Sequence, residues 1–293
     1  MTTPISDTLP SAEDAPTIEI VTCPTGDDSG FHTSNNPENP YQRKNVIQRE
    51  SRVIIKCDHK DIIHGYFSND INDLYTLIIY EFRFHPNGPA SRIKEAHVVL
   101  KYSAMTIGKL DPEVVNLYPD GGFFVDPALQ HEEVTAGGGV NFGAGGAVAQ
   151  VGAELKAEKS TQRDTTSYTT ITGGARTSRG VEPNDSVRWD LLENQTTKSG
   201  VVSTLQVAVL LKRRSMDPFK ASIAITVTAD LRSQIQMAFK REPQEDDVWY
   251  DPRKPPTDRL HKYDVDNIGK LNLKDLGDVT ARTIVPGAVK AQR

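Results

Sequence analysis

The chain has 293 residues, of which 37% are hydrophobic, and its formal net charge is −5 at pH 7. This acidic balance gives no electrostatic reason to expect nucleic acid as a partner. Two cysteines are too few for a disulfide framework or for a zinc site of four cysteines, and they predict free thiols in the reducing cytoplasm. No stretch approaches the roughly 18 consecutive apolar residues of a transmembrane helix.

Composition divides the chain into three parts. Residues 1–47 are rich in Pro, Ser, Thr, Asn and Asp, which predicts a disordered polar leader. Residues 48–240 carry the apolar runs of a folded domain. Residues 241–293 form a proline-rich tail that we expect to extend over the domain, held by Trp249 and Tyr250 and containing one short helix near its end.

The first strands are predicted between residues 51 and 86. The runs SRVIIKC (51–57) and DIIHGYF (61–67) are rich in β-branched and aromatic residues, and the polar residues between them predict a hairpin turn. The run DLYTLIIYEFRFHP (73–86) follows and ends in a turn cluster of Pro, Asn and Gly. Its second half alternates aromatic with polar residues, so we expect one buried face and one wet face.

The remaining strands follow at turn-separated intervals. The run EVVNLYPDGGFFV (113–125) predicts a hairpin that turns at residues 119–122. Further strands are expected in 92–104, 165–177, 185–194, 200–214 and 218–231. Roughly ten strands predict a mainly β protein, an antiparallel β-sandwich or barrel-like single domain.

The segment GGGVNFGAGGAVAQVGAELKAEK (137–159) is unusually rich in small residues. It lacks the glycine and lysine spacing of a phosphate-binding loop. At strand spacing, alternate residues from Ala149 to Ala157 are apolar, whereas at helical spacing Val140, Val148, Val151 and Leu155 share a stripe. We favour the strand, because the threonine-rich run after it is a ready partner. The resulting hairpin, residues 137–177, then forms either the edge of the sandwich or a membrane-inserting element.

No catalytic motif is recognisable, so enzymatic activity stays undecided, and no cofactor is expected. The run DHKDIIH (58–64) resembles a metal cluster, but on a regular strand His59 and Asp61 share a face that excludes His64, so no metal site is expected. A cavity between the sheets is the candidate site. Its candidate lining residues are Tyr80, Phe82, Phe84, Tyr168 and Trp189, with Glu81, His97 and Arg188 as polar groups.

Several sequence segments together resemble those of a known protein family, among them YEFRFHPNGPASRIKEAHVVLKYSA, VRWDLLENQTTKSGVVSTLQVAVLLKRR and DPRKPPTDRLHKYDVDNIGKLNLKDLGDVT. Over residues 50–285 the chain resembles a widespread family of intracellular fungal proteins of similar length whose function is uncharacterised. The resemblance implies a fungal origin and one continuous domain, and it transfers no site residue.

Three functions are therefore considered, in this order. The first is a non-catalytic β-sandwich that binds a partner, either a protein, a small apolar molecule or a membrane surface. The second is an enzyme of fungal specialised metabolism, a cyclase or isomerase that acts through a shaped cavity. The third is a membrane-active defence protein that uses the 137–177 hairpin.

Overall fold

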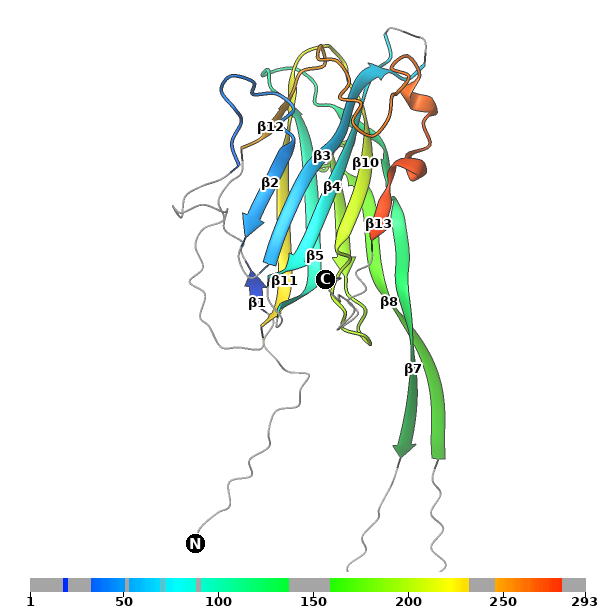
Figure 1. Cartoon of the computed structure of the whole chain (residues 1–293). Coiled ribbons are helices and arrows are strands. Elements are labelled where there is room, and N and C mark those ends of the chain that lie inside the picture. The colour runs from blue at the N-terminus through cyan, green and yellow to red at the C-terminus, as the bar shows by residue number, and fades with distance from the viewer. Residues whose placement is uncertain are drawn as a thin grey trace, which may run out of the picture.

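The computed structural model describes residues 18–20, 33–50, 53–68, 70, 72–87, 91–136, 159–231 and 246–280. These residues form two antiparallel β-sheets that face each other as a sandwich, which confirms the predicted fold class (Figure 1). None of the helices in these ranges is long and apolar enough to cross a bilayer.

The first sheet has seven strands in the order β1–β11–β5–β9–β8–β7, with β12 paired to β11. The bounds of its strands are β1 Ile18–Ile20, β5 Ser91–Ala104, β7 Gly121–Ala136, β8 Lys159–Arg176, β9 Ser186–Leu192, β11 Phe219–Leu231 and β12 Val248–Tyr250. Strand β12 carries Trp249 and Tyr250, so this part of the tail is held to the domain as predicted.

The second sheet has six strands in the order β13–β10–β4–β3–β2, with β6 paired to β10. The bounds are β2 Asn45–Glu50, β3 Val53–Tyr66, β4 Leu74–Pro86, β6 Glu113–Tyr118, β10 Thr204–Lys212 and β13 Asp278–Thr280. Two short 3-10 helices, η1 Ile268–Lys270 and η2 Leu273–Leu276, stand where one short helix was expected.

The main core lies between the sheets, where the alternate side chains of each strand meet. Trp189 of β9 packs on Phe82 of β4 with ring centroids 6.4 Å apart, and both side chains are fully buried. In the second half of β4, Phe82 and Phe84 face this core while Glu81 and Arg83 remain partly exposed. The predicted alternation of this half-strand is therefore confirmed.

A second apolar cluster covers the other face of the second sheet. Ile63 of β3, Leu77 and Ile79 of β4 pack there against Ile268 and Leu276 from the tail. The first half of β4 is consequently buried on both faces. This explains why its sequence, LYTLII, is apolar without alternation.

Two predicted turns are wrong. The segment 58–64 is part of one continuous strand, β3, because its polar side chains find partners inside the protein. The run 113–125 is not a hairpin, since β6 pairs with β10 in one sheet and β7 pairs with β8 in the other. Its turn residues instead carry the chain from sheet to sheet, with a cis peptide bond before Pro119.

Candidate functional site

Strands β7 and β8 pair with each other far beyond the rest of their sheet. Strand β9 accompanies β8 only between Thr170 and Arg176, whereas the β7–β8 pairing continues outward to the pair Ala136–Lys159. We call residues 129–136 and 159–166 the distal ribbon. Among the described residues, no third strand pairs with this ribbon, and Figure 1 shows it projecting from one end of the sandwich.

The ribbon begins at an irregularity in β7. The pairing register shifts between Val125 and Ala128, and Asp126 has a positive φ of 55°. Aspartate tolerates this left-handed conformation better than most residues, and the following Pro127 fixes its own φ. A bulge of this kind bends a strand and increases its twist, so it sets the direction in which the ribbon leaves the body.

Asn194, which follows β9, holds both strands at this point. Its amide nitrogen donates to the backbone oxygen of Asp126 at 2.9 Å and to that of Ser167 at 3.0 Å. Its amide oxygen accepts from the Ser167 hydroxyl at 2.7 Å and from the backbone N–H of Thr196 at 2.9 Å. Because Asn194 is fully buried, these bonds join the ribbon firmly to the body at its base.

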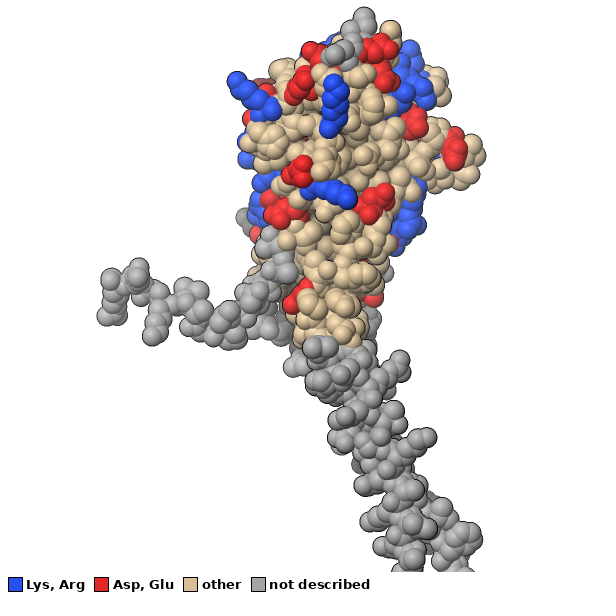
Figure 2. Space-filling view, turned by 90° about the vertical axis from the view of Figure 1, so that its right-hand side faces the viewer, with Lys and Arg blue, Asp and Glu red and all other residues tan. Residues whose placement is uncertain are grey.

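An exposed apolar patch lies beside the base of the ribbon. Phe124 of β7 and Tyr168 of β8 have ring centroids 5.3 Å apart and are 66% and 39% exposed. Leu192 of β9 continues the row, since it pairs with Thr170, which pairs with Phe124. Figure 2 views the right-hand side of Figure 1, where β7 and β8 lie, and shows few charged side chains where the body narrows downward. Exposed apolar patches of this kind mark contact surfaces.

The eight predicted cavity residues are not brought together. Tyr80, Phe82, Phe84 and Trp189 lie in the main core, where they pack on other side chains. The Tyr80 hydroxyl lies 2.9 Å from that of Tyr250, and burial followed by neighbouring phenols raises the pKa of Tyr80 well above its ordinary value. These aromatic residues therefore fill the space between the sheets.

Tyr168, the fifth aromatic residue of the prediction, belongs to the exposed patch described above. The polar candidates face outward. Glu81 lies on the outer face of the second sheet, 3.0 Å from Lys60, and also contacts Arg83. Partial burial raises the pKa of Glu81, but the hydrogen bonds from both cations outweigh burial and lower it.

His97 and Arg188 share the outer face of the first sheet. Their ring and guanidinium nitrogens lie 2.6 Å and 2.7 Å from the same oxygen of Asp190. Partial burial opposes ionisation of Asp190, but hydrogen bonds from Arg188 and His97 lower its pKa. This arrangement is a surface ion network on paired strands, and the aromatic core separates it from Glu81 on the second sheet.

The polar residues of β3 are structural partners. An irregularity at Lys60 shifts the register, so His59 pairs with Tyr80 and His64 with Thr76, while Asp61 faces the tail. The prediction that His59 and Asp61 share a face is therefore wrong. Within the described ranges, no three His, Cys, Asp or Glu side chains are placed to hold a metal ion.

Asp61 anchors the tail through hydrogen bonds to both of its carboxylate oxygens. One oxygen accepts from the Thr257 hydroxyl and from the backbone N–H of Arg259, each at 2.7 Å. The other accepts from the backbone N–H of Leu260 at 2.9 Å and from the Tyr263 hydroxyl at 3.1 Å. The Asp61 carboxylate is fully buried, and with these donors it fixes a segment of the tail that lies as far as 202 residues away in sequence, at Tyr263.

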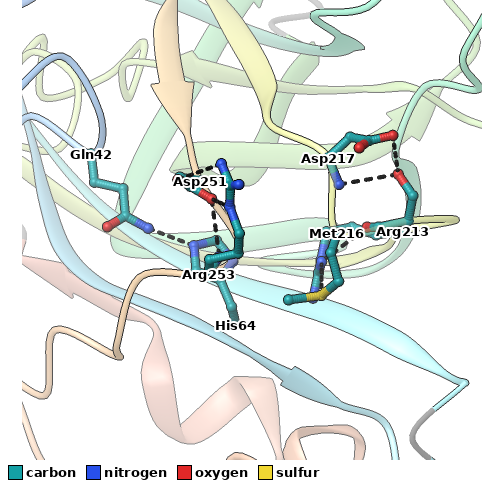
Figure 3. A network of polar contacts seen from close by, with 8 residues as sticks. Gln42, His64, Arg213, Met216, Asp217, Asp251 and Arg253 are labelled. Atoms are coloured by element: carbon teal, nitrogen blue, oxygen red, sulfur yellow. Dashed lines mark hydrogen bonds and ion pairs between the residues drawn. The ribbon is translucent and has the colours of Figure 1, made fainter.

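His64 belongs to a polar network at the end of the sandwich opposite to the ribbon (Figures 1 and 3). Gln42 contacts its Nε2, and the Thr76 hydroxyl lies 2.9 Å from its Nδ1. Burial, and secondarily the nearby Arg213, lower the pKa of His64 to about 3. Arg213 itself donates to the backbone oxygen of Tyr75 at 3.0 Å, so this network ties loops to strand ends.

Sequence reasoning missed Asn194 and the bulge at Asp126. The Asp-Pro dipeptide inside the strand-like run was the available signal, because it interrupts a regular strand. Residues 137–158 of the small-residue segment lie outside the described residues, so their prediction as a strand stays a prediction. The prediction that this strand pairs with the threonine-rich run is wrong, because that run is part of β8 and pairs with β7.

Comparisons with known proteins give no family assignment. No family model matches the chain, and no curated protein matches it. Among solved structures, Clostridium perfringens delta-toxin is similar to this chain with a TM-score of 0.27 and 11% identity, over 77% of this chain and 86% of that one. A similarity at this level carries no argument about the function of this protein.

Proposed function

We propose that the protein is a non-catalytic, membrane-active protein that inserts the hairpin based on β7 and β8 into a lipid bilayer. The observation that carries this proposal is the distal ribbon, in which two strands continue without the sheet that supports their inner halves. Among the three functions considered from the sequence, membrane insertion is the one that uses this feature. It is also one case of the broader prediction of a binding protein.

The physical argument starts from the edges of the ribbon. A two-stranded ribbon is marginally stable in water, because each strand has only one neighbour and unpaired N–H and C=O groups line both edges. Proteins usually shorten or cover such edges. A ribbon held at its base by Asn194 and left without a third strand among the described residues is therefore suited to gain partners later.

The sequence that joins the two strands supports insertion rather than another kind of docking. Residues 137–158 contain the alternating apolar positions between Ala149 and Ala157, separated by Gln150, Glu154 and Lys156. Strands that cross a membrane alternate lipid-facing apolar residues with polar residues over about 9–11 residues. The threonine-rich β8 and the small residues of this segment both suit such strands.

The body provides a scaffold in this proposal. The aromatic residues considered for an enzyme cavity pack against one another in the core, so no observation favours the alternative of a cyclase or isomerase. The fungal origin and the cytoplasmic location stay predictions from the sequence. The defence role is likewise a prediction from the sequence.

Dye release from phosphatidylcholine vesicles, with and without anionic lipid, tests the proposal. The matched control replaces residues 137–158 by Asn-Gly, because Ala136 and Lys159 are directly opposite and a two-residue turn can join them. We expect the full chain to release the dye, and the shortened variant to unfold at the same temperature without releasing it. Release by both proteins, or by neither, would contradict membrane insertion by this hairpin.

A further inference from the structure

The two strands of the distal ribbon differ in formal charge. On β7, residues 129–136 carry two carboxylates, Glu132 and Glu133, and no lysine or arginine. On β8, residues 159–166 carry two cations, Lys159 and Arg163, and one carboxylate, Asp164. With histidine neutral, the formal charge is −2 on the β7 segment and +1 on the β8 segment.

Each strand also has one edge without a partner strand among the described residues. Strand β7 pairs only with β8 along the distal ribbon, and β8 pairs only with β7 there. The strand with the net negative formal charge, β7, thus has one such edge, and the strand with the net positive formal charge, β8, has the other. An edge that offers unpaired backbone groups together with charge accepts a strand of the opposite charge.

We infer that the partner of the distal ribbon is a second copy of this chain, with the β7 edge of one copy pairing antiparallel to the β8 edge of the next. The contact is heterologous, because two different edges meet, and contacts of this kind generate rings when the rotation closes. Two acidic edges or two basic edges would repel each other, so the charges select the head-to-tail arrangement.

This inference rests on the proposed membrane insertion and deepens it. Lipid offers no hydrogen bonds to a strand edge, so strands that cross a bilayer must form a closed sheet. Closed sheets in membranes contain about eight strands or more, and each chain supplies two, so about four copies or more are needed. The edge pairing of the ribbon supplies the contact through which such copies join.

Charge exchange between the edges tests the inference. One variant carries Glu132→Lys and Glu133→Lys, and the other carries Lys159→Glu and Arg163→Glu, so that each has two edges of like charge. We expect each variant alone to lose at least about tenfold in vesicle-bound oligomers, measured by amine-independent photo-crosslinking and denaturing gels, because like charges cost more than about 1.4 kcal/mol per contact.

Two rescues make the test specific. An equimolar mixture of the two variants, and one chain carrying all four substitutions, both place opposite charges at every contact again, so both should restore the oligomers. Oligomers from either variant alone at the level of the unchanged chain, or loss without rescue, would overturn the inference. Unchanged thermal unfolding of the body shows that the variants fold.

Dye release measured in the same samples separates this inference from the proposed function. Release by the unchanged chain, together with oligomers that neither charge variant reduces, overturns the edge contact and leaves membrane insertion standing. Oligomers without release overturn membrane insertion and leave the edge contact standing. Absence of both overturns both.

Discussion

Strand β4 and the outer half of strand β7 are both long strands, but they are held in opposite ways. Strand β4 has β3 on one edge and β10 on the other, and its first half is buried on both faces. The outer half of β7 has β8 as its single neighbour among the described residues. The comparison separates a body, whose stability comes from packing, from a ribbon that contributes little to that stability.

This division matters for the proposed membrane insertion. A segment can rearrange at low cost only if the free energy that holds the remaining fold does not depend on it. Substitutions in the body, at its junction with the ribbon and in the ribbon itself should therefore have effects of decreasing size.

The largest effect is expected in the body, from its two buried histidines. Burial lowers the pKa of His59 and of His64 to about 3, compared with an ordinary value of 6.5. The folded protein thus favours the neutral imidazoles, and their contribution to stability is complete above about pH 6.5 and is lost as the pH falls toward 3. At about pH 4, the free energy of unfolding should be lower by about 3 kcal/mol for each histidine.

The variant His64→Gln isolates one of these contributions, because glutamine offers polar atoms near Gln42 and Thr76 but does not titrate. Urea unfolding at pH 7.5 and at pH 4 measures the loss in each protein. The loss should be smaller by about 3 kcal/mol in the variant, since carboxylates contribute equally to both proteins. Equal losses would show that His64 titrates normally in the folded state.

A smaller effect is expected at the junction, from Asn194→Ala. The substitution removes the buried amide that bonds both strands of the ribbon and leaves the backbone oxygens of Asp126 and Ser167 without this partner. We expect a loss of about 2 kcal/mol in the free energy of unfolding, together with faster amide hydrogen exchange at the ribbon base. Ser199→Ala, at an exposed position of the same loop, is the control and should cost less than about 0.5 kcal/mol.

The sequence predicted the body better than the features that depend on distant partners. The alternation of Phe82 and Phe84 with Glu81 and Arg83 follows from the period of a strand, and it correctly predicted a face of the core. The buried Asp61 could not be predicted in this way. Its donors come from Thr257, Arg259, Leu260 and Tyr263, which local patterns cannot connect to β3, so a polar turn was the natural but wrong interpretation.

The candidate site was predicted in part for a similar reason. The threonine-rich strand that became β8 was recognisable from its β-branched residues. Its partner was not, because the prediction paired it with the small-residue segment 137–159, whereas the structure pairs it with β7. The pairing register, the bulge and the Asn194 bonds depend on which strands meet in the folded sheet. The predicted cavity is not formed by these residues. Strand alternation correctly places aromatic side chains on a common face, but it does not show that side chains of the facing sheet fill the space beside them.

The smallest effect is expected in the distal ribbon, from Val134→Ala. Val134 is directly opposite Thr161, in the part of the ribbon that has no third strand among the described residues. A two-stranded ribbon is close to its own unfolding equilibrium in water, so the substitution should change the free energy of unfolding of the whole protein by less than about 0.5 kcal/mol.

The matched control is Val207→Ala in β10, where the side chain is fully buried and the loss should be about 2 kcal/mol. Urea unfolding of both variants compares the two valines directly. A loss at Val134 as large as that at Val207 would mean that ribbon and body unfold as one unit, and the ribbon could then rearrange only at the expense of the body.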